Sequence, residues 1–151
     1  MFVPDPQRPR VLLIGGGARL DDIVAFTREL QDRGDARSKP LVLIELNAPN
    51  LFRPRPSTIL VPGMPEGTIA CVPLLDEWGI ASRLASVDGY PGCYEGGVVE
   101  LAAAWLDSLD RQALDETQML VWGSAAVIDA AAAVARRFDV PCRSGADPQP
   151  R

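Results

Sequence analysis

The chain has 151 residues, a net charge of −5 and no histidine. A length of this order is typical of one domain with a complete hydrophobic core. The acidic balance, without a run of basic residues, argues against nucleic acids and membranes as partners. Because histidine is the commonest general base and metal ligand, its absence also excludes the usual Ser-His and Cys-His catalytic pairs.

The cysteines, the apolar stretches and the first residues of the chain further limit the class of protein. Cys71, Cys93 and Cys142 show no CxxC spacing, so we expect reduced structural thiols and no metal site. The sequence has no 18-residue apolar stretch, and its first residues lack the basic and apolar regions of a signal peptide. We therefore expect a cytoplasmic protein with one domain over 1–143 and a disordered tail at 144–151.

Strand-like and helix-like segments alternate along the chain. Short apolar runs predict buried strands at 11–14, 41–44, 83–86 and 119–122. Helical patterns lie between and after them, at 21–34, 73–78, 98–109 and 125–137. The residues 138–142 are typical of a last edge strand. The proline-rich stretch 47–65 is expected to follow the surface, with a short edge hairpin between 59–61 and 68–70.

This alternation predicts an α/β domain with a doubly wound parallel sheet of four to five strands and helices on both faces. In such sheets ligands bind beyond the carboxyl ends of the strands. The candidate cofactor-binding residues gather there: Gly15, Gly16, Gly17, Ala18, Ser86, Asp88, Gly123 and Ser124. The first turn is not GxGxxG, because Leu20 stands at the third glycine position, and no acid follows at a strand end about 20 residues later.

The sequence also predicts the roles of several side chains in these helices, as N-caps or as residues that face the core. Asp21 and Asp22 suit the start of the first helix, where either is a candidate N-cap, and Ser124 is the expected N-cap of the last. In the helix at 73–78, Leu74 and Trp78 are expected to face the core beside Leu75. No residue is predicted to be catalytic.

Six segments, in order along nearly the whole chain, resemble the NAD(P)H-binding lobe of dihydroorotate dehydrogenase electron-transfer subunits, in the ferredoxin–NADP reductase superfamily. These segments are 8–17, 56–63, 69–80, 82–86, 89–96 and 138–142. The resemblance implies a ferredoxin reductase NAD(P)-binding-domain-like fold. Family members add a flavin-binding β-barrel before this lobe and a [2Fe–2S] segment after it. Neither FAD nor an iron–sulfur cluster is expected on this chain, which alone cannot be the complete reductase.

The departures from the family fall on its cofactor positions. The family motif Gly-Gly-Gly-x-Gly-x-x-Pro reads Gly-Gly-Gly-Ala-Arg-Leu-Asp-Asp over 15–22. Arg19 replaces a glycine, and is either a phosphate clamp or a surface arginine paired with the following aspartates, which would repel a pyrophosphate. Trp122 replaces a cysteine beside the nicotinamide, whose space the indole is expected to fill. Val98-Val99-Glu100 replaces Val-Thr-Asp and loses a hydroxyl.

Two functions follow as expectations. The first is a degenerate, stand-alone lobe without redox turnover, acting as an interaction or regulatory module that forms a homodimer or docks on a flavin/iron–sulfur subunit. The second is a split electron-transfer subunit that binds NAD(P)H and passes electrons to a separate flavin/iron–sulfur protein. Nucleotide affinity separates them, because only the second requires NADH or NADPH to bind.

Overall fold

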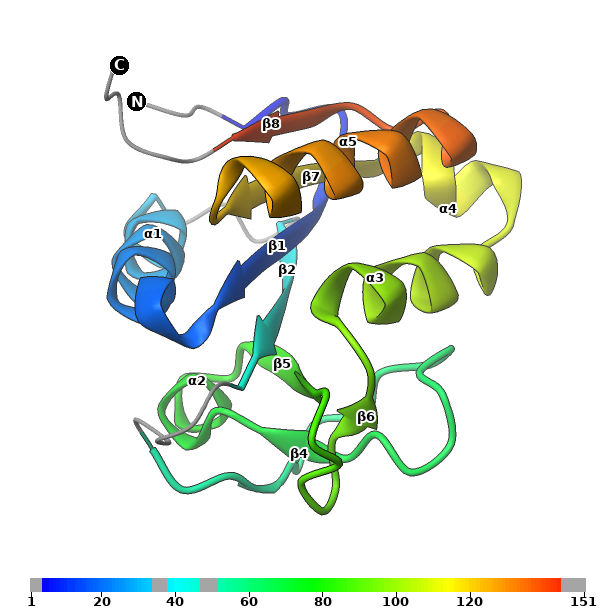
Figure 1. Cartoon of the computed structure of the whole chain (residues 1–151). Helices are drawn as coiled ribbons and strands as arrows, with labels where there is room; N and C mark the ends of the chain where they lie inside the picture. Colours follow the sequence, from blue (N-terminus) through cyan, green and yellow to red (C-terminus); the bar gives the residue numbers. More distant parts are fainter. Residues whose placement is uncertain (1–3, 34–37, 47–51, 145–151) are drawn as a thin grey trace.

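The structure, a computed structural model, describes residues 4–33, 38–46 and 52–144 (Figure 1). A six-stranded sheet forms its centre, with every strand parallel and in the order β6-β5-β2-β1-β7-β8. The strands are β1 (Arg10–Gly16), β2 (Lys39–Glu45), β5 (Ala81–Ser86), β6 (Tyr94–Glu95), β7 (Thr117–Trp122) and β8 (Cys142–Ser144). The predicted doubly wound parallel sheet is confirmed.

Helices cover both faces of this sheet (Figure 1). A single 3-10 turn, η1 (Gly17–Arg19), leads from β1 into the first of them. The helices are α1 (Leu20–Asp32), α2 (Pro73–Glu77), α3 (Val98–Asp107), α4 (Arg111–Asp115) and α5 (Ala125–Phe138). Helices α1 and α2 pack on one face, and α3, α4 and α5 contribute to the core of the other.

The two faces account for the uninterrupted apolar runs of the strands. Leu12 and Ile14 of β1 belong to the core under α3 and α5, while Val11 and Leu13 belong to the core under α1. All four are at most 2% exposed. Successive side chains of a strand point to opposite faces, so a central parallel strand covered on both sides must be apolar at every position.

The sheet edges differ from the sequence prediction. The two-residue strand β6 was not predicted, because so short a run carries no alternation signal. The last strand was expected at 138–142, but α5 continues through Phe138 and β8 begins at Cys142. Asp139 ends α5 in the left-handed conformation (φ 58°), so the chain turns sharply before it can enter the sheet.

The edge hairpin was also misplaced. The antiparallel pair is β3 (Arg55–Pro56) with β4 (Ala70–Cys71), and residues 59–61 are not in a strand. Side chains hold the segment after β3 elsewhere: Asp76 accepts hydrogen bonds from the hydroxyls of Ser57 and Thr58, at 2.7 and 2.8 Å. These bonds direct the segment onto α2, away from the ladder.

A buried arginine holds the same segment against the sheet. Arg83, in the middle of β5, is 6% exposed and donates to the carbonyls of Ile59 (2.6 Å) and Ser82 (2.7 Å). Burial lowers the pKa of its guanidinium, which the charges of Cys71 and Asp76 partly oppose. Within the described residues its Nε has no hydrogen-bond partner. Arg83 is therefore a structural clamp for a loop that has little secondary structure of its own.

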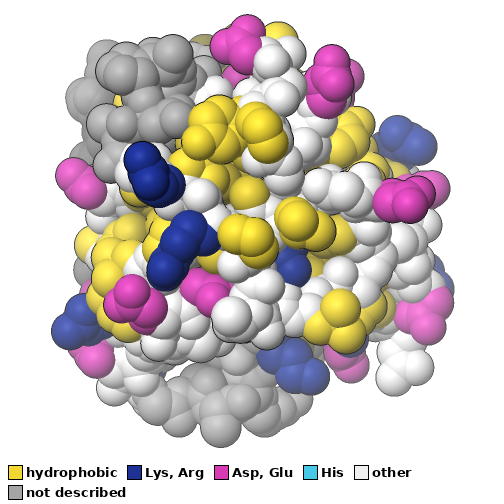
Figure 2. Space-filling model, turned by 90° about the horizontal axis from the view of Figure 1, so that it is seen from below, with side chains coloured by type: hydrophobic (Ala, Val, Ile, Leu, Met, Phe, Trp, Pro, Cys, Tyr) yellow, Lys and Arg dark blue, Asp and Glu magenta, His cyan; other side chains and the backbone are white. Residues whose placement is uncertain are grey.

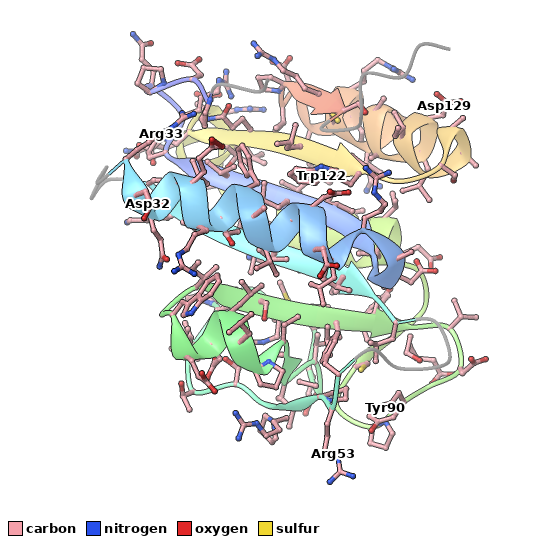
Figure 3. All side chains as sticks on the ribbon, turned by 90° about the vertical axis from the view of Figure 1, so that its left-hand side faces the viewer. Asp32, Arg33, Arg53, Tyr90, Trp122 and Asp129 are labelled. Atoms are coloured by element: carbon pink, nitrogen blue, oxygen red, sulfur yellow. The ribbon has the colours of Figure 1, made fainter. Side chains whose placement is uncertain are left out.

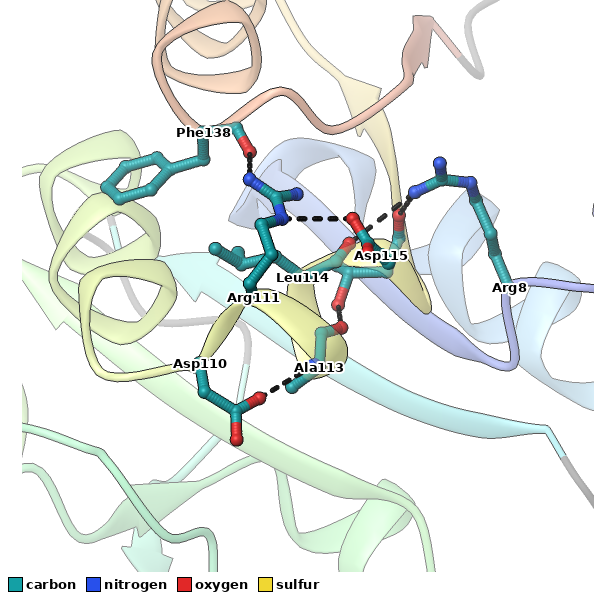
Figure 4. A network of polar contacts seen from close by, with 8 residues as sticks. Arg8, Asp110, Arg111, Ala113, Leu114, Asp115 and Phe138 are labelled. Carbon is teal, nitrogen blue, oxygen red and sulfur yellow. Dashed lines mark hydrogen bonds and ion pairs between the residues drawn. The ribbon is translucent and has the colours of Figure 1, made fainter.

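Helix α4 was not predicted, and polar contacts fix it at the end of the sheet opposite the glycine turn (Figure 4). Asp110 caps its first turn through the amide of Ala113, at 2.8 Å. Arg111 pairs with Asp115 (2.9 Å) and donates to the carbonyl of Phe138 (3.3 Å), which ties α4 to the end of α5. A five-residue helix is too short to show an apolar period, so its caps were the only available signal.

Two helix details correct the sequence prediction. Helix α1 begins at Leu20 with Arg19 as its N-cap, so neither Asp21 nor Asp22 is the cap, although both lie in the first turn, as the helix dipole favours. In α2 only Leu75 is fully buried, and Leu74 is 42% exposed because five residues present one narrow face to the core. The predicted end of α1 at Gly34 lies outside the described residues, and so does the tail predicted at 144–151, except for Ser144, which is the last residue of β8.

Candidate ligand pocket

A pocket of about 410 Å³ lies at the carboxyl ends of β1, β2 and β7. This is where the strand order reverses, since the chain leaves β1 toward β2 and later returns to β7 on the other side. Ligands of open α/β sheets bind at this point. The pocket is lined by Gly16, Ala18, Arg19, Glu45, Val98, Gly123, Ser124 and Val127. Four of the eight predicted cofactor residues, Gly16, Ala18, Gly123 and Ser124, are thus brought together.

The other four predicted residues do not line it. Gly15 is buried within β1 and Gly17 is buried in η1. Ser86 and Asp88 lie at the end of β5, separated from β1 by β2. Ser86 is 3% exposed, and its hydroxyl accepts a hydrogen bond from the amide of Tyr90 at 3.1 Å, so it fixes the loop that follows β5.

The glycines of the first turn have different roles. A Cβ on Gly15 would lie 2.6 Å from Cδ1 of Ile23 and 3.2 Å from the carbonyl oxygen of Trp122, whereas one on Gly17 would meet only the Glu45 carbonyl oxygen, at 3.6 Å. Gly15 therefore allows α1 to pack closely against the sheet. The absence of a side chain at Gly15 therefore serves the packing of the core rather than the binding of a ligand.

Arg19 is paired with an acid in the first turn of α1, the helix that it caps. Its Nε donates to Oδ2 of Asp22 at 2.8 Å, an i,i+3 ion pair with side chains 31% and 54% exposed. Of the two sequence interpretations, the arginine paired with a following aspartate is the one that the geometry supports. The guanidinium still lines the pocket, but part of its charge is already balanced.

The start of α3 carries two carboxylates on its amides. Glu45, the last residue of β2, accepts from the amide of Val98 through Oε1 at 2.9 Å. Glu100 reaches back to accept from the amide of Gly97 at 2.8 Å. Free amides at a helix start are the groups that bind phosphate. Here the chain's own acids occupy two of them beside the pocket.

Glu45 is the site residue that sequence reasoning missed. Parallel pairing sets Glu45 opposite Gly16, which places the acid directly beside the glycine turn. The dinucleotide motif places its acid about 20 residues after the glycines, and Glu45 lies further along the chain. One feature of the sequence could have identified Glu45, namely its position immediately after the apolar run 41–44. Because the carboxyl ends of parallel strands meet at one edge of the sheet, a residue at that position lies near the glycine turn.

At the start of α5 a hydroxyl, rather than a carboxylate, accepts a hydrogen bond from a backbone amide. Ser124 is the N-cap, as predicted, and its Oγ accepts from the amide of Val127 at 3.3 Å. The side chain of Val127 lines the pocket beside it and, with Val98, provides the apolar part of the wall.

Trp122 does not occupy the pocket. Its side chain is 4% exposed and packs against Phe26 of α1, with ring centroids 5.6 Å apart. Figure 3, which views the molecule from the α1 side, shows Trp122 beside this helix. The expectation that the indole fills the ligand space is therefore wrong. As the last residue of β7, Trp122 directs its side chain to the α1 face, and the following glycine borders the pocket instead.

The thiols offer little reactivity. Burial raises the pKa of Cys71, Cys93 and Cys142, and for Cys71 the neighbouring Asp76 raises it further. A protonated thiol is a poor nucleophile and a poor metal ligand at neutral pH. In the described part of the chain, no three His, Cys, Asp or Glu side chains come together in a way that could hold a metal ion. No helix there has the length and apolar character needed to cross a membrane.

The sheet order, its helical layers and a pocket at the reversal point define the class: a doubly wound parallel α/β domain with the layout of an NAD(P)-binding lobe. Two solved structures of the C-terminal domain of PF1911 hydrogenase from Pyrococcus furiosus share this fold. Their TM-scores are 0.52 and 0.51 at 13% identity, over 94% of this chain and 94% and 95% of theirs. At this identity the likeness concerns the fold alone. No family model and no curated protein matches the sequence.

Proposed function

We propose that this chain is a degenerate NAD(P)H-binding lobe, related to the dihydroorotate dehydrogenase electron-transfer subunit, that acts as an interaction or regulatory module without redox turnover of its own. The observation that carries the proposal is the pair of hydrogen bonds from Val98 and Gly97 to Glu45 and Glu100. A phosphate group that approached this helix start would meet two carboxylates in place of free amides.

The electrostatic argument adds to the loss of donors. Two unit charges of like sign 4 Å apart repel by roughly 1 kcal/mol in water and about 4 kcal/mol near a protein surface. Asp22 already accepts a hydrogen bond from the Nε of Arg19, which is the one cation among the pocket-lining residues. A dinucleotide therefore gains little from the arginine and is opposed by the acids.

The interaction part of the proposal rests on exposed apolar side chains at the β5–β6 end of the molecule. The large hydrophobic residues exposed in the described chain are Leu60 (85%), Val87 (65%), Ile69 (52%), Leu74 (42%) and Tyr90 (38%). Figure 2 looks at this end and shows hydrophobic side chains gathered with basic ones between them. Backbone hydrogen bonds join Ile69 to Ser57 and to Gly92, so these segments lie together. Apolar surface of this kind marks protein contacts.

Calorimetric titration with NADH, NADPH and FAD tests the lost cofactor site. We expect no binding tighter than about millimolar, because carboxylates occupy two amides at the start of α3 and Asp22 pairs with Arg19. A dissociation constant in the micromolar range for NADH or NADPH would contradict the proposal. A folded sample, checked by circular dichroism, is the control.

Sedimentation at increasing protein concentration tests whether a second copy covers the apolar end. If it does, the double variant Leu60→Ser/Ile69→Ser sediments as a monomer where the unchanged chain is a dimer, and Leu20→Ser, on α1, leaves the dimer intact. If the unchanged chain is monomeric at every concentration, a homodimer is excluded and a different protein, such as a flavin/iron–sulfur subunit, is the partner to seek.

A second candidate function is favoured by one observation. The pocket at the strand-order reversal is open and bordered by Gly16, Ala18 and Gly123, and no indole fills it. A split electron-transfer subunit would bind NAD(P)H there and pass electrons to a separate flavin/iron–sulfur protein. The same titration decides between the two functions, because this one requires measurable affinity for NADH or NADPH.

A further inference from the structure

Two arginines, one just before β3 and one within it, have no partner in the described part of the chain. Arg53 and Arg55 are both exposed, and neither makes an ion pair or a side-chain hydrogen bond with a described residue. Arg10, Arg19 and Arg111 differ from them, because each pairs with an acid. On a chain with a net charge of −5, these two unpaired cations form a local basic site.

The prolines around these arginines limit how far the segment can bend. Arg53 precedes Pro54, and Arg55 precedes Pro56. A residue before proline is restricted to extended conformations, and proline fixes its own φ. Pairing with Cys71 in the β3–β4 ladder also holds Arg55. The two guanidiniums therefore extend from a stiff segment, which reduces the conformational entropy lost when a partner binds.

Apolar side chains lie beside this segment. The amide of Ser57 donates to the carbonyl of Ile69 at 2.9 Å, and the amide of Ile69 donates to the carbonyl of Gly92 at 2.9 Å. The segment after β3, the segment before β4 and the loop after β5 thus lie side by side. Ile69 and Tyr90 are exposed there. Figure 3 shows Tyr90 and Arg53 at the same end of the molecule, beyond β5.

We propose that a docking surface formed by Arg53, Arg55, Ile69 and Tyr90 binds an acidic segment with apolar side chains on a different protein. The inference rests on the interaction part of the proposed function and specifies the chemistry of the partner. Carboxylates of the segment would accept hydrogen bonds from the two guanidiniums, each of which can bind a carboxylate through two parallel bonds. Its apolar side chains would cover Ile69 and Tyr90. Arginine and tyrosine are among the residues that contribute most at protein interfaces.

Other occupants fit this surface less well. In a twofold dimer the surface would face itself, so guanidiniums would meet guanidiniums. Exposed acids also occur in the neighbouring segments, at Glu66, Glu77 and Asp88, but none of them forms an ion pair with Arg53 or Arg55. An anionic membrane would repel a chain with a net charge of −5, whereas a peptide can contact the two arginines alone.

Binding of short fluorescent peptides, followed by anisotropy and by amide chemical shifts, tests the proposal. In the probe glutamate alternates with leucine; one control has lysine in place of glutamate, and a second has serine in place of leucine. We expect the glutamate–leucine peptide to bind at least about tenfold more tightly than either control and to shift the amides of Arg55, Ile69 and Tyr90. Absence of binding, equal binding of the lysine peptide, or shifts confined to other residues overturns the proposal.

The double variant Arg53→Gln/Arg55→Gln removes both charges and keeps long polar side chains. We expect it to bind the glutamate–leucine peptide at least about tenfold more weakly and to lose its preference over the lysine peptide. Arg136→Gln/Arg137→Gln, in the exposed last turn of α5, changes the net charge equally and is the matched control. It should retain the affinity of the unchanged chain. Equal losses in both double variants would show that only net charge matters and would refute the assigned surface.

Further measurements separate the occupants and the two proposals. A dimer that Arg53→Gln/Arg55→Gln dissociates, or binding to phosphatidylserine vesicles without binding to the glutamate–leucine peptide, overturns the inference in favour of a second copy or a membrane. If neither the peptide nor NADH binds, the docking inference fails and the lost cofactor site stands. If NADH binds with micromolar affinity and the peptide also binds, the proposed function fails and the docking surface stands.

Discussion

Glu45 and Glu100 each place a carboxylate oxygen on a backbone amide at the start of α3, although they come from different elements. The first belongs to the end of β2 and the second to the helix itself. Each amide would otherwise be an open donor at a helix start. At the scale of single residues, two side chains thus occupy backbone donors at a helix start beside the pocket.

Asp76 illustrates a residue whose charge stabilises the fold rather than the pocket. Partial burial raises its pKa, but hydrogen bonds from Ser57 and Thr58 outweigh this, and the net pKa lies below the ordinary aspartate value. Stability from a carboxylate with a lowered pKa is present above its unfolded pKa and is lost as the pH falls through the folded value.

We therefore predict that Asp76→Asn lowers the free energy of unfolding by about 1 kcal/mol at pH 7. The difference from the unchanged chain should shrink as the pH falls from the ordinary aspartate pKa through the lowered one, since both forms are then uncharged. Urea unfolding at a series of pH values measures this. Glu77→Gln, an exposed neighbour on α2, is the control. A difference that does not depend on pH would show that the charge of Asp76 is unimportant.

At the scale of elements, the first glycine turn combines packing with access to the pocket. Gly15 faces Ile23 of α1, and Gly16 borders the pocket. Both glycines were predicted to bind a cofactor, because a glycine run after a strand does not reveal which member faces a ligand. Only the register with β2 and β7 separates them.

This difference predicts unequal effects of two alanine substitutions. Gly15→Ala should lower the free energy of unfolding by about 1–3 kcal/mol, because its Cβ would collide with Ile23 and approach the backbone of β7. Gly17→Ala should cost much less, since its Cβ meets one atom at an ordinary distance of 3.6 Å. Urea unfolding of the two variants makes the comparison. Equal losses would contradict the packing role assigned to Gly15.

The sequence predicted the elements that have a strong period and missed those that do not. The apolar runs at 11–14 and 41–44 could only be buried strands of a covered sheet, and both lie within the observed β1 and β2. The strand β6 and the helix α4 consist of two and five residues, too few for a pattern. The misplaced hairpin has a different cause, because Asp76 and Arg83 act on residues 57–59 from distant positions.

For the whole molecule, the strand order decides which predicted residues meet. It brings Gly16 and Ser124 to one pocket and leaves Ser86 and Asp88 beyond β2. The sequence predicted the edge of the sheet at which a site would form. It could not predict the direction of individual side chains, such as Trp122, whose burial against Phe26 depends on its register in β7.

The central claim is that the acids at the start of α3, rather than the shape of the pocket, prevent a dinucleotide from binding. Calorimetric titration of NADH into the unchanged chain and into Glu45→Gln/Glu100→Gln tests it most directly. Both glutamines can still accept from Val98 and Gly97, so the helix start is kept while two negative charges are removed. We expect no binding tighter than about millimolar to the unchanged chain and a dissociation constant at least about tenfold below that limit for the double variant. Micromolar binding to the unchanged chain, or no gain in a folded double variant, would contradict the account.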